Sequence, residues 1–212
     1  MCIAELTIQT ATLERIGLMK LWVALPTIGI WASCLLGMMP LHAQTTKKWT
    51  PSEILATAKP GRWVEIDAVI RKDQSVLALE IEFRAGDFMD DDWRFLAKVR
   101  TVNPAKKELQ VFSVPVQIAK DTEFDEDEGI RSLDDVKPEM LVKIEGTYMN
   151  DGIFLAKEVD NRTKKLKAEP EFDRTLEVLG KVGQVDEAKR TITVMGIQFQ
   201  ITEETEGKSL IK

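Results

Sequence analysis

The segment KPGRWVEIDA at residues 59–68 returns as KPEMLVKIEG at residues 137–146. The agreement continues without a gap, because Asp73 corresponds to Asp151 and the pair Leu77-Ala78 corresponds to Leu155-Ala156. Ungapped similarity of this length indicates an internal duplication, and the duplication decides how the chain is divided. We call this repeated segment the back half.

A second segment, the front half, also occurs twice. The sequence LAKV at residues 96–99 matches LGKV at residues 179–182. Farther along, Gln117-Ile118 matches Gln200-Ile201, and Thr122 matches Thr205. The order along the chain is therefore back, front, back, front.

The β-branched and alternating character of these halves predicts strands. In the front half we expect strands at residues 95–102, 108–112 and 114–118. In the back half we expect one helical turn at residues 132–136, stopped by Lys137-Pro138, and strands at residues 141–148 and 153–159. The Asn150-Asp151-Gly152 sequence between them is a hairpin signal. Three strands, a short helical element and two strands are the elements of a five-stranded OB-type barrel.

The predicted fold class is therefore mainly β, with two small five-stranded OB-like barrels after an N-terminal signal or anchor helix. Residues 93–160 contain one complete barrel. Residues 53–84 and 175–206 are leftover halves, and neither buries its apolar face alone because a few short strands are marginally stable in water. We expect the two ends to form a second, permuted barrel, with residues 161–174 as a linker. The alternative is a swapped dimer in which the halves pair between chains.

The N-terminus indicates export. Met19-Lys20 precedes an uncharged apolar stretch at residues 21–41, and Ala43 ends a candidate cleavage site. Residues 1–18 do not fit this pattern, so we interpret residues 1–43 as an upstream extension plus a signal peptide. This predicts a periplasmic or secreted protein. If the segment is not cleaved, residues 21–41 instead anchor the chain in the inner membrane.

The order of short motifs carries a family resemblance. A Gly/Ala-Lys-Val opening is followed by Thr122 after the third strand, then by Val-x-Ile-x-Gly and Leu-Ala-x-x-Val. On these motifs residues 93–160 resemble a bacterial exported OB-like β-barrel domain family of unknown function. The resemblance supplies no catalytic residues. The pattern expects glycine where this chain has Glu139 and Ala68, so we expect local differences there.

Composition excludes several chemistries. Both cysteines and the single histidine lie within residues 1–43, so the remaining chain lacks the usual general base, thiol nucleophile and soft metal ligands. We therefore predict that the protein is not an enzyme and needs no cofactor. An acidic run offers one alternative, a calcium site formed by oxygen donors at Asp121, Glu123, Asp125 and Asp127. The calcium-loop spacing is not met, because Glu128 stands where that loop requires glycine. A solvated charged loop is the competing interpretation.

The favoured function is a non-catalytic envelope module that binds another protein, a glycan or the cell surface through its turns. The candidate turns are Lys72–Ser75, Asn103–Lys107, Asn150–Gly152 and Asp186–Arg190. A calcium-binding adhesin that uses the acidic loop at residues 121–128 is the first alternative, and an oligonucleotide-binding OB-type protein is the second. Nucleic acid is not an expected partner, because the formal charge is −6 and aromatic residues are scarce in the strands. Trp63 aligns with Leu141, and Phe112 aligns with Met195, so both pairs are predicted to be packing positions.

Overall fold

The computed structural model describes residues 48–209 and confirms a mainly β chain. The expected signal segment lies outside the described residues. Across residues 48–209 no helix has the length and apolar character needed to cross a membrane. The strands are β1 (Trp63–Ile70), β2 (Val76–Phe83), β3 (Trp93–Asn103), β4 (Glu108–Val111), β5 (Val114–Phe124), β6 (Leu141–Tyr148), β7 (Phe154–Asn161), β8 (Thr175–Asp186), β9 (Thr191–Val194), β10 (Ile197–Gln200) and β11 (Glu206–Ser209). The helical elements are α1 (Pro51–Thr57), η1 (Pro104–Lys106), η2 (Leu133–Asp135), α2 (Thr163–Ala168) and η3 (Pro170–Arg174).

Five consecutive strands form what we call the central set, β3 to β7. They pair in the order β3-β4-β5-β7-β6, and β3 pairs again with β6. The pairing of β5 with β7 is parallel, whereas the other pairings of this set are antiparallel. The strand pairings of the central set therefore form a closed cycle, because its last strand, β6, pairs with its first, β3.

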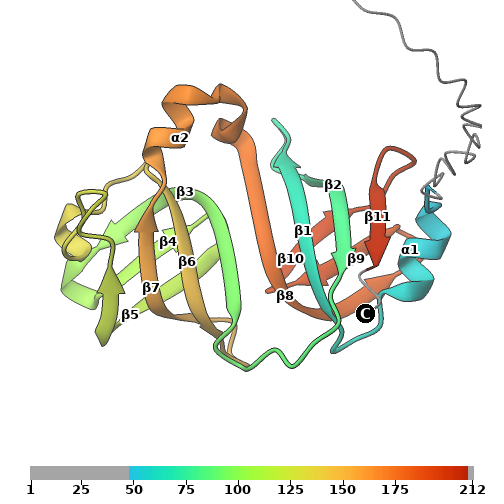
Figure 1. The fold of residues 1–212 in the computed structure, drawn as a ribbon, viewed down its shortest axis with the longest axis horizontal. Helices are drawn as coiled ribbons and strands as arrows, with labels where there is room; N and C mark the ends of the chain where they lie inside the picture. The colour runs from blue at the N-terminus through green and yellow to red at the C-terminus, as the bar shows by residue number, and fades with distance from the viewer. Residues whose placement is uncertain (1–47, 210–212) are drawn as a thin grey trace, which may run out of the picture. The chain divides into compact units, whose positions relative to one another are not determined.

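The remaining strands form the terminal set, β1, β2 and β8 to β11, which combines the two ends of the described chain (Figure 1). They pair in the order β1-β2-β10-β9-β8, and β8 pairs again with β1. Here β2 pairs in parallel with β10 and β11. Strands from residues 63–83 and 175–209 thus lie hydrogen-bonded within one chain.

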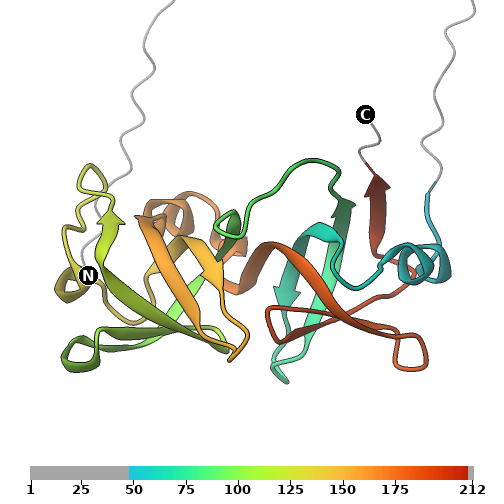
Figure 2. The ribbon, with the colours of Figure 1, turned by 90° about the horizontal axis from the view of Figure 1, so that it is seen from below.

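A short helical element accompanies each set. Helix α1 begins with a capping box, in which Thr50 and Glu53 satisfy each other's backbone N–H groups. Its buried Leu55 corresponds to Leu133 of η2, which is also buried. Helix α1 packs beside β11, where a Cβ placed on Gly207 would lie 2.9 Å from Ile54 (Figure 2). Each set therefore closes one end of its core with the same element of the repeat.

The two sets belong to one sheet, joined by β3 and β8. Phe95 lies opposite Val178 in this short antiparallel pairing. A row of ring contacts crosses the joint, with centroid separations of 4.9 Å for Phe88 and Trp63, 5.2 Å for Trp63 and Trp93, and 5.6 Å for Trp93 and Tyr148. Trp63 and Trp93 are buried. The prediction that Trp63 is a core residue is confirmed.

The structure describes the connections in more detail. The expected linker, residues 161–174, contains the short helical elements α2 and η3. The turn at Glu139 keeps the conformation of the corresponding turn at Gly61, because Glu139 has a φ of 70° and Gly61 a φ of 84°. The local difference expected at Glu139 is therefore not found. Ala68 lies in a strand rather than a turn, at a β-bulge of β1, and Gly146 stands at the equivalent bulge of β6.

Candidate functional site

A groove lies between the terminal and central sets. It consists of two cavities of about 410 and 390 Å³, within the size range of small-molecule sites. Three residues line both cavities, Gln74 from the β1–β2 turn, Arg100 from β3 and Phe112 from the β4–β5 turn. We call this the shared groove. The first cavity is completed by Ser75, Val76, Ser113, Thr191, Gly196, Ile197, Gln198 and Gln200, and the second by Ile70, Arg71, Lys72, Lys98, Val99, Glu139, Asp173, Arg174 and Thr175.

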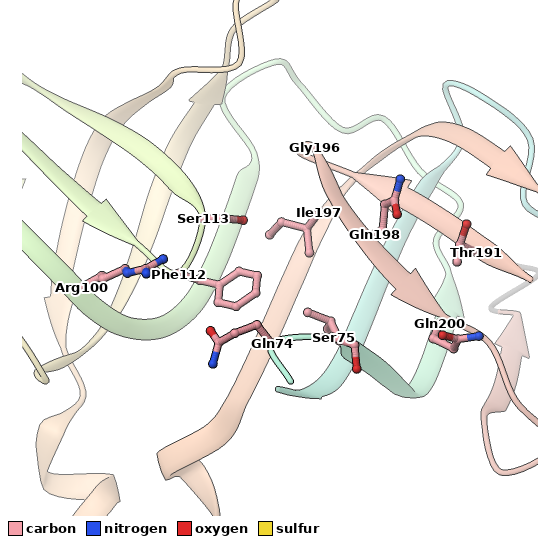
Figure 3. A pocket seen from close by; sticks show the side chains of 11 residues that line it. Gln74, Ser75, Arg100, Phe112, Ser113, Thr191, Gly196, Ile197, Gln198 and Gln200 are labelled. Carbon is pink, nitrogen blue, oxygen red and sulfur yellow. The ribbon is translucent and has the colours of Figure 1, made fainter. Parts of the chain in front are cut away.

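Phe112 holds a central position because its turn has only two residues. Val111 of β4 pairs with Val114 of β5, so Phe112 and Ser113 must reverse the chain between them. Phe112 adopts a φ of 51°, a left-handed conformation that is costly for a bulky side chain. Its ring projects from the central set toward Gln74 and Ile197 of the terminal set (Figure 3). The turn therefore places a partly exposed aromatic ring inside the groove.

The position of Gln74 is also set by a tight turn between two strands. Asp73 Oδ1 accepts hydrogen bonds from the Ser75 backbone N–H at 3.0 Å and from the Ser75 hydroxyl at 2.6 Å, which fixes the hairpin. Gln74 has a φ of 67°, whereas glycine stands at the corresponding Gly152 with a φ of 87°. The repeat thus uses a permissive glycine in one hairpin and a strained glutamine in the other.

The second cavity is rich in positive charge. Arg71, Lys72, Arg100 and Arg174 are exposed there, and none makes an ion pair with another residue of the described range 48–209. Lys98 is different, because its Nζ lies 2.5 Å from Glu139 and 2.9 Å from Asp173. Burial opposes its charge, but the hydrogen bonds that Lys98 donates to these two carboxylates raise its pKa above the usual value. Both carboxylates of this cavity therefore form ion pairs with Lys98, whereas four of its cationic side chains face solvent.

The four predicted binding turns fall into two groups. Lys72 and Ser75 line the shared groove from opposite ends of their turn. The other three turns line neither cavity, and their polar residues make local bonds. Asn103 accepts from the Lys106 N–H, Asp151 accepts from the Ile153 N–H, and Asp186 accepts from the Lys189 N–H.

The structure places the predicted calcium ligands along an open loop. Asp121, Glu123 and Asp127 are exposed, and Asp125 accepts a hydrogen bond from the Glu128 N–H at 3.2 Å. Within residues 48–209 no group of three or more His, Cys, Asp or Glu side chains is arranged to hold a metal ion. Calcium binding by this loop stays a prediction from sequence.

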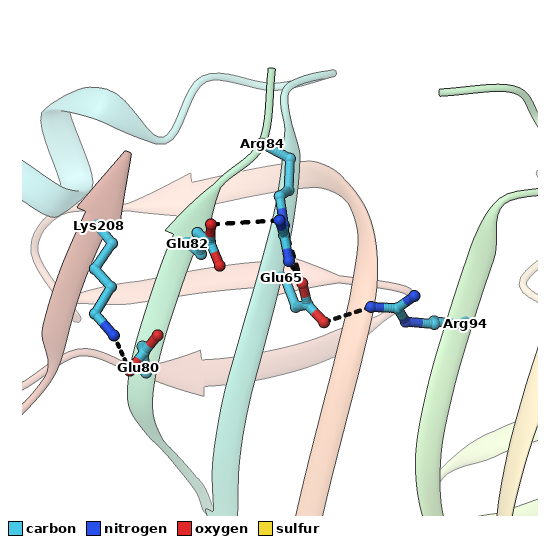
Figure 4. Close-up of polar contacts among 6 residues, drawn as sticks. All are labelled: Glu65, Glu80, Glu82, Arg84, Arg94 and Lys208. Carbon is cyan, nitrogen blue, oxygen red and sulfur yellow. Dashed lines mark hydrogen bonds and ion pairs between the residues drawn. The ribbon is translucent and has the colours of Figure 1, made fainter. Parts of the chain in front are cut away.

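A separate acidic face lies on β1, β2 and β8. Asp67 stands opposite Glu80 of β2 and opposite Glu177 of β8. Desolvation and neighbouring carboxylates raise the pKa of Asp67, and desolvation and Asp67 raise the pKa of Glu177. Nearby, Glu65 binds both Arg84 and Arg94, the latter at 2.5 Å, while Lys208 binds Glu80 at 2.7 Å (Figure 4). Arg94 belongs to β3, so this ion pair also ties the two sets together.

Sequence reasoning missed Arg100, Phe112 and Arg174. A signal for the first two was present, because Arg100 aligns with Gly183 and Phe112 aligns with the buried Met195. These two groove residues are thus found where the two front halves differ. The expectation that Phe112 is a packing position is only partly met, since its side chain packs against the core and also lines the cavity.

Comparison with known proteins gives one match. Residues 44–82 and 98–160 match a family model described as a domain of unknown function (DUF5666). The two matched segments cover most of both back halves and most of one front half of the repeat. No curated protein and no solved structure matches the chain.

Proposed function

We propose that this chain is a non-catalytic, exported binding module of the bacterial envelope, and that its ligand occupies the shared groove. In this proposal the terminal set, residues 53–84 with 175–206, and the central set, residues 93–160, are two OB-type barrels. The closed cycles of strand pairing support it. Export is supported by the sequence of residues 19–43.

The main support for the proposal is the position of the groove on the terminal set. An OB-type barrel binds ligands on the face of its second and third strands and through the loop between its fourth and fifth strands. In the permuted set these strands are β9 and β10, and the loop is the β1–β2 turn. Thr191, Gln198 and Gln200 supply the face, while Gln74 and Ser75 supply the loop. The groove therefore coincides with the surface that this kind of barrel uses.

The side chains of the groove favour binding over catalysis. Its two carboxylates, Glu139 and Asp173, both contact Lys98, so neither is a free general base. The remaining polar groups are amides, hydroxyls and cations, which recognise a ligand without exchanging protons near neutral pH. A non-enzymatic envelope protein with a glycan or protein partner is the function that this chemistry supports.

Retention of envelope components on the immobilised protein tests the proposal. The experiment compares wild type with Arg100→Ala and Phe112→Ala, and with Arg131→Ala as a control at an exposed arginine outside the groove. We expect one extract component to be retained by wild type and by Arg131→Ala, and lost from both groove variants. Equal retention by the groove variants, or no retention by wild type, would show that the groove is not the binding surface.

A further inference from the structure

The two cavities of the shared groove differ in chemistry. Apart from Arg100, which lines both cavities, the first is lined by uncharged residues, with amides at Gln198 and Gln200 and a hydroxyl at Thr191. The second is lined by five cationic side chains and only two carboxylates. Phe112 lies where the cavities meet. A ligand that fills the groove must therefore carry a neutral hydrogen-bonding part and an anionic part.

The cations of the second cavity are unusual for this chain. The formal net charge is −6, yet Arg71, Lys72, Arg100 and Arg174 gather in one cavity without ion-pair partners in the described part of the chain. Guanidinium groups bind carboxylates with paired, parallel hydrogen bonds. Three of the four free cations are arginines. The cavity is suited to a compact carboxylate group.

The first cavity suits hydroxyl groups. Gln74, Gln198 and Gln200 each offer a donor and an acceptor on one side chain, and none of these amides makes a side-chain hydrogen bond within residues 48–209. Sugar hydroxyls also donate and accept at adjacent positions, so they pair with such amides. The Phe112 ring makes no stacking contact with another aromatic ring of the described residues, which leaves its exposed part available to the apolar face of a pyranose.

Backbone strain at the groove is an independent observation. Of the six non-glycine residues with positive φ in the described range 48–209, Gln74, Phe112 and Glu139 line the groove. Their counterparts in the repeat are Gly152, Met195 and Gly61, of which Met195 has a positive φ as a non-glycine residue. Left-handed conformations of non-glycine residues cost about 1–3 kcal/mol each and cluster at ligand sites. Gln74 and Glu139 therefore hold left-handed positions where the repeat has glycine, which indicates that their side chains are needed in the groove, whereas the positive φ of Phe112 is shared with Met195.

We propose that the shared groove binds an acidic oligosaccharide, with a neutral sugar on Phe112 in the first cavity and a uronate carboxylate held by Arg100 and its neighbours in the second. This inference rests on the proposed function and names its ligand class. A single-stranded nucleic acid fits less well, because the chain is acidic overall and the groove offers one aromatic ring where such sites use several.

Titration calorimetry with trigalacturonate tests this assignment, with maltotriose as the neutral sugar, triglutamate as an acidic peptide and hexathymidylate as a nucleic acid. We expect trigalacturonate to bind at least about tenfold more tightly than any of the others, since one charge-assisted hydrogen bond accounts for that factor. Arg100→Ala should weaken trigalacturonate binding about tenfold and leave maltotriose nearly unchanged. Phe112→Ala should weaken both sugars, and the control Arg131→Ala should weaken neither.

The outcomes of the two experiments distinguish an error in the proposed ligand class from an error in the proposed binding site. Preference for triglutamate or hexathymidylate, or equal binding of trigalacturonate by wild type and Arg100→Ala, would overturn the acidic-sugar assignment. If trigalacturonate does not bind while the groove variants still lose the extract component, the proposed function stands and the ligand class is wrong. If the extract component is also retained equally by the groove variants, both proposals fail. Circular dichroism of each variant verifies that the fold is intact.

Discussion

The hydroxyl of Thr205 donates a hydrogen bond to the carbonyl oxygen of Ala78 at 2.8 Å, across 127 positions of the sequence. The same oxygen of Thr205 accepts from the Thr202 N–H at 3.0 Å. In the central set Thr122 makes the matching pair of bonds, to the Ala156 carbonyl at 2.7 Å and from the Ala119 N–H at 2.9 Å. The repeat has thus kept one contact in both sets, buried at Thr205 and part-buried at Thr122, although in the terminal set its partners come from opposite ends of the described chain.

Replacing Thr205 with valine should destabilise the whole fold. The substitution keeps the shape of the side chain but leaves a buried carbonyl and a backbone N–H without a partner, which costs about 1–3 kcal/mol. We expect that loss in the free energy of unfolding measured by urea denaturation. Thr101→Val, at an exposed position of β3, is the control and should change little. An unchanged midpoint for Thr205→Val would show that this contact does not hold the chain ends together.

The strands were predictable because the repeat marks them twice. The strand expected at residues 141–148 matches β6, and the turn expected at residues 103–107 contains η1. The strand expected at residues 114–118 was too short, because β5 continues to Phe124 past an irregularity where Thr122 bonds across to β7. Alternation of apolar residues does not reveal a strand that resumes after such an irregularity.

The groove was harder to predict for a different reason. It is formed between two strand sets, and a sequence repeat describes each set but not the surface between them. Phe112 and Met195 have similar positive φ values in equivalent two-residue turns, yet Met195 is buried and Phe112 is partly exposed, a difference that the alignment does not show. Only the turn at residues 72–75 was both predicted and found in the groove.

Gly180 is required by the joint between the two sets. A Cβ at this position would lie 2.7 Å from the Trp93 ring and 2.9 Å from Val194, closer than carbon atoms approach in folded proteins. Gly180→Ala should therefore lower the free energy of unfolding by about 1–3 kcal/mol through overpacking. Gly183→Ala, where the nearest atom is 3.5 Å away, should be neutral or slightly stabilising. Tryptophan fluorescence during denaturation reports both, and equal stabilities would contradict the packing argument.

Asp67 should make the fold less stable as the pH rises. Its pKa is raised by desolvation and by the carboxylates of Glu65 and Glu80, so the folded chain keeps this proton to a higher pH than the unfolded chain. Folding takes up a proton between the two pKa values, and stability falls as the pH rises through that interval. Asp67→Asn should therefore raise the free energy of unfolding at pH 7 by about 0.2–1 kcal/mol, the size of cross-strand charge effects. The difference should shrink as the pH approaches 3.

Glu65 provides the matched control with the opposite sign. Burial opposes its ionisation, but hydrogen bonds from Arg84 and Arg94 outweigh burial and lower its pKa. The stability that Glu65 contributes is thus present at neutral pH and lost as the pH falls through its folded-state pKa. Glu65→Gln should lower the melting temperature at pH 7, whereas Asp67→Asn raises it. Shifts of the same sign at pH 7 would contradict the assigned environments.

Gln74 should be a residue whose removal stabilises the fold and weakens binding. Gln74→Gly releases a left-handed backbone strain of about 1–3 kcal/mol, reduced by the larger entropy of glycine in the unfolded chain. We expect a net gain of about 1 kcal/mol in the free energy of unfolding. The Asp73 bonds to Ser75 do not depend on the substituted side chain, so the hairpin should keep its form.

The reciprocal change at Gly152 tests whether a glutamine at a left-handed position lowers stability in the equivalent hairpin as well. Gly152→Gln places a side chain at a φ of 87° in the equivalent hairpin, whose turn residues line neither cavity, and should lower stability by about 1–3 kcal/mol without affecting retention of the envelope component. Gln74→Gly should reduce that retention even as the melting temperature rises. Because a purely structural glutamine does not produce a gain in stability together with a loss of binding, the two measurements on one variant decide whether the strain at Gln74 serves the groove.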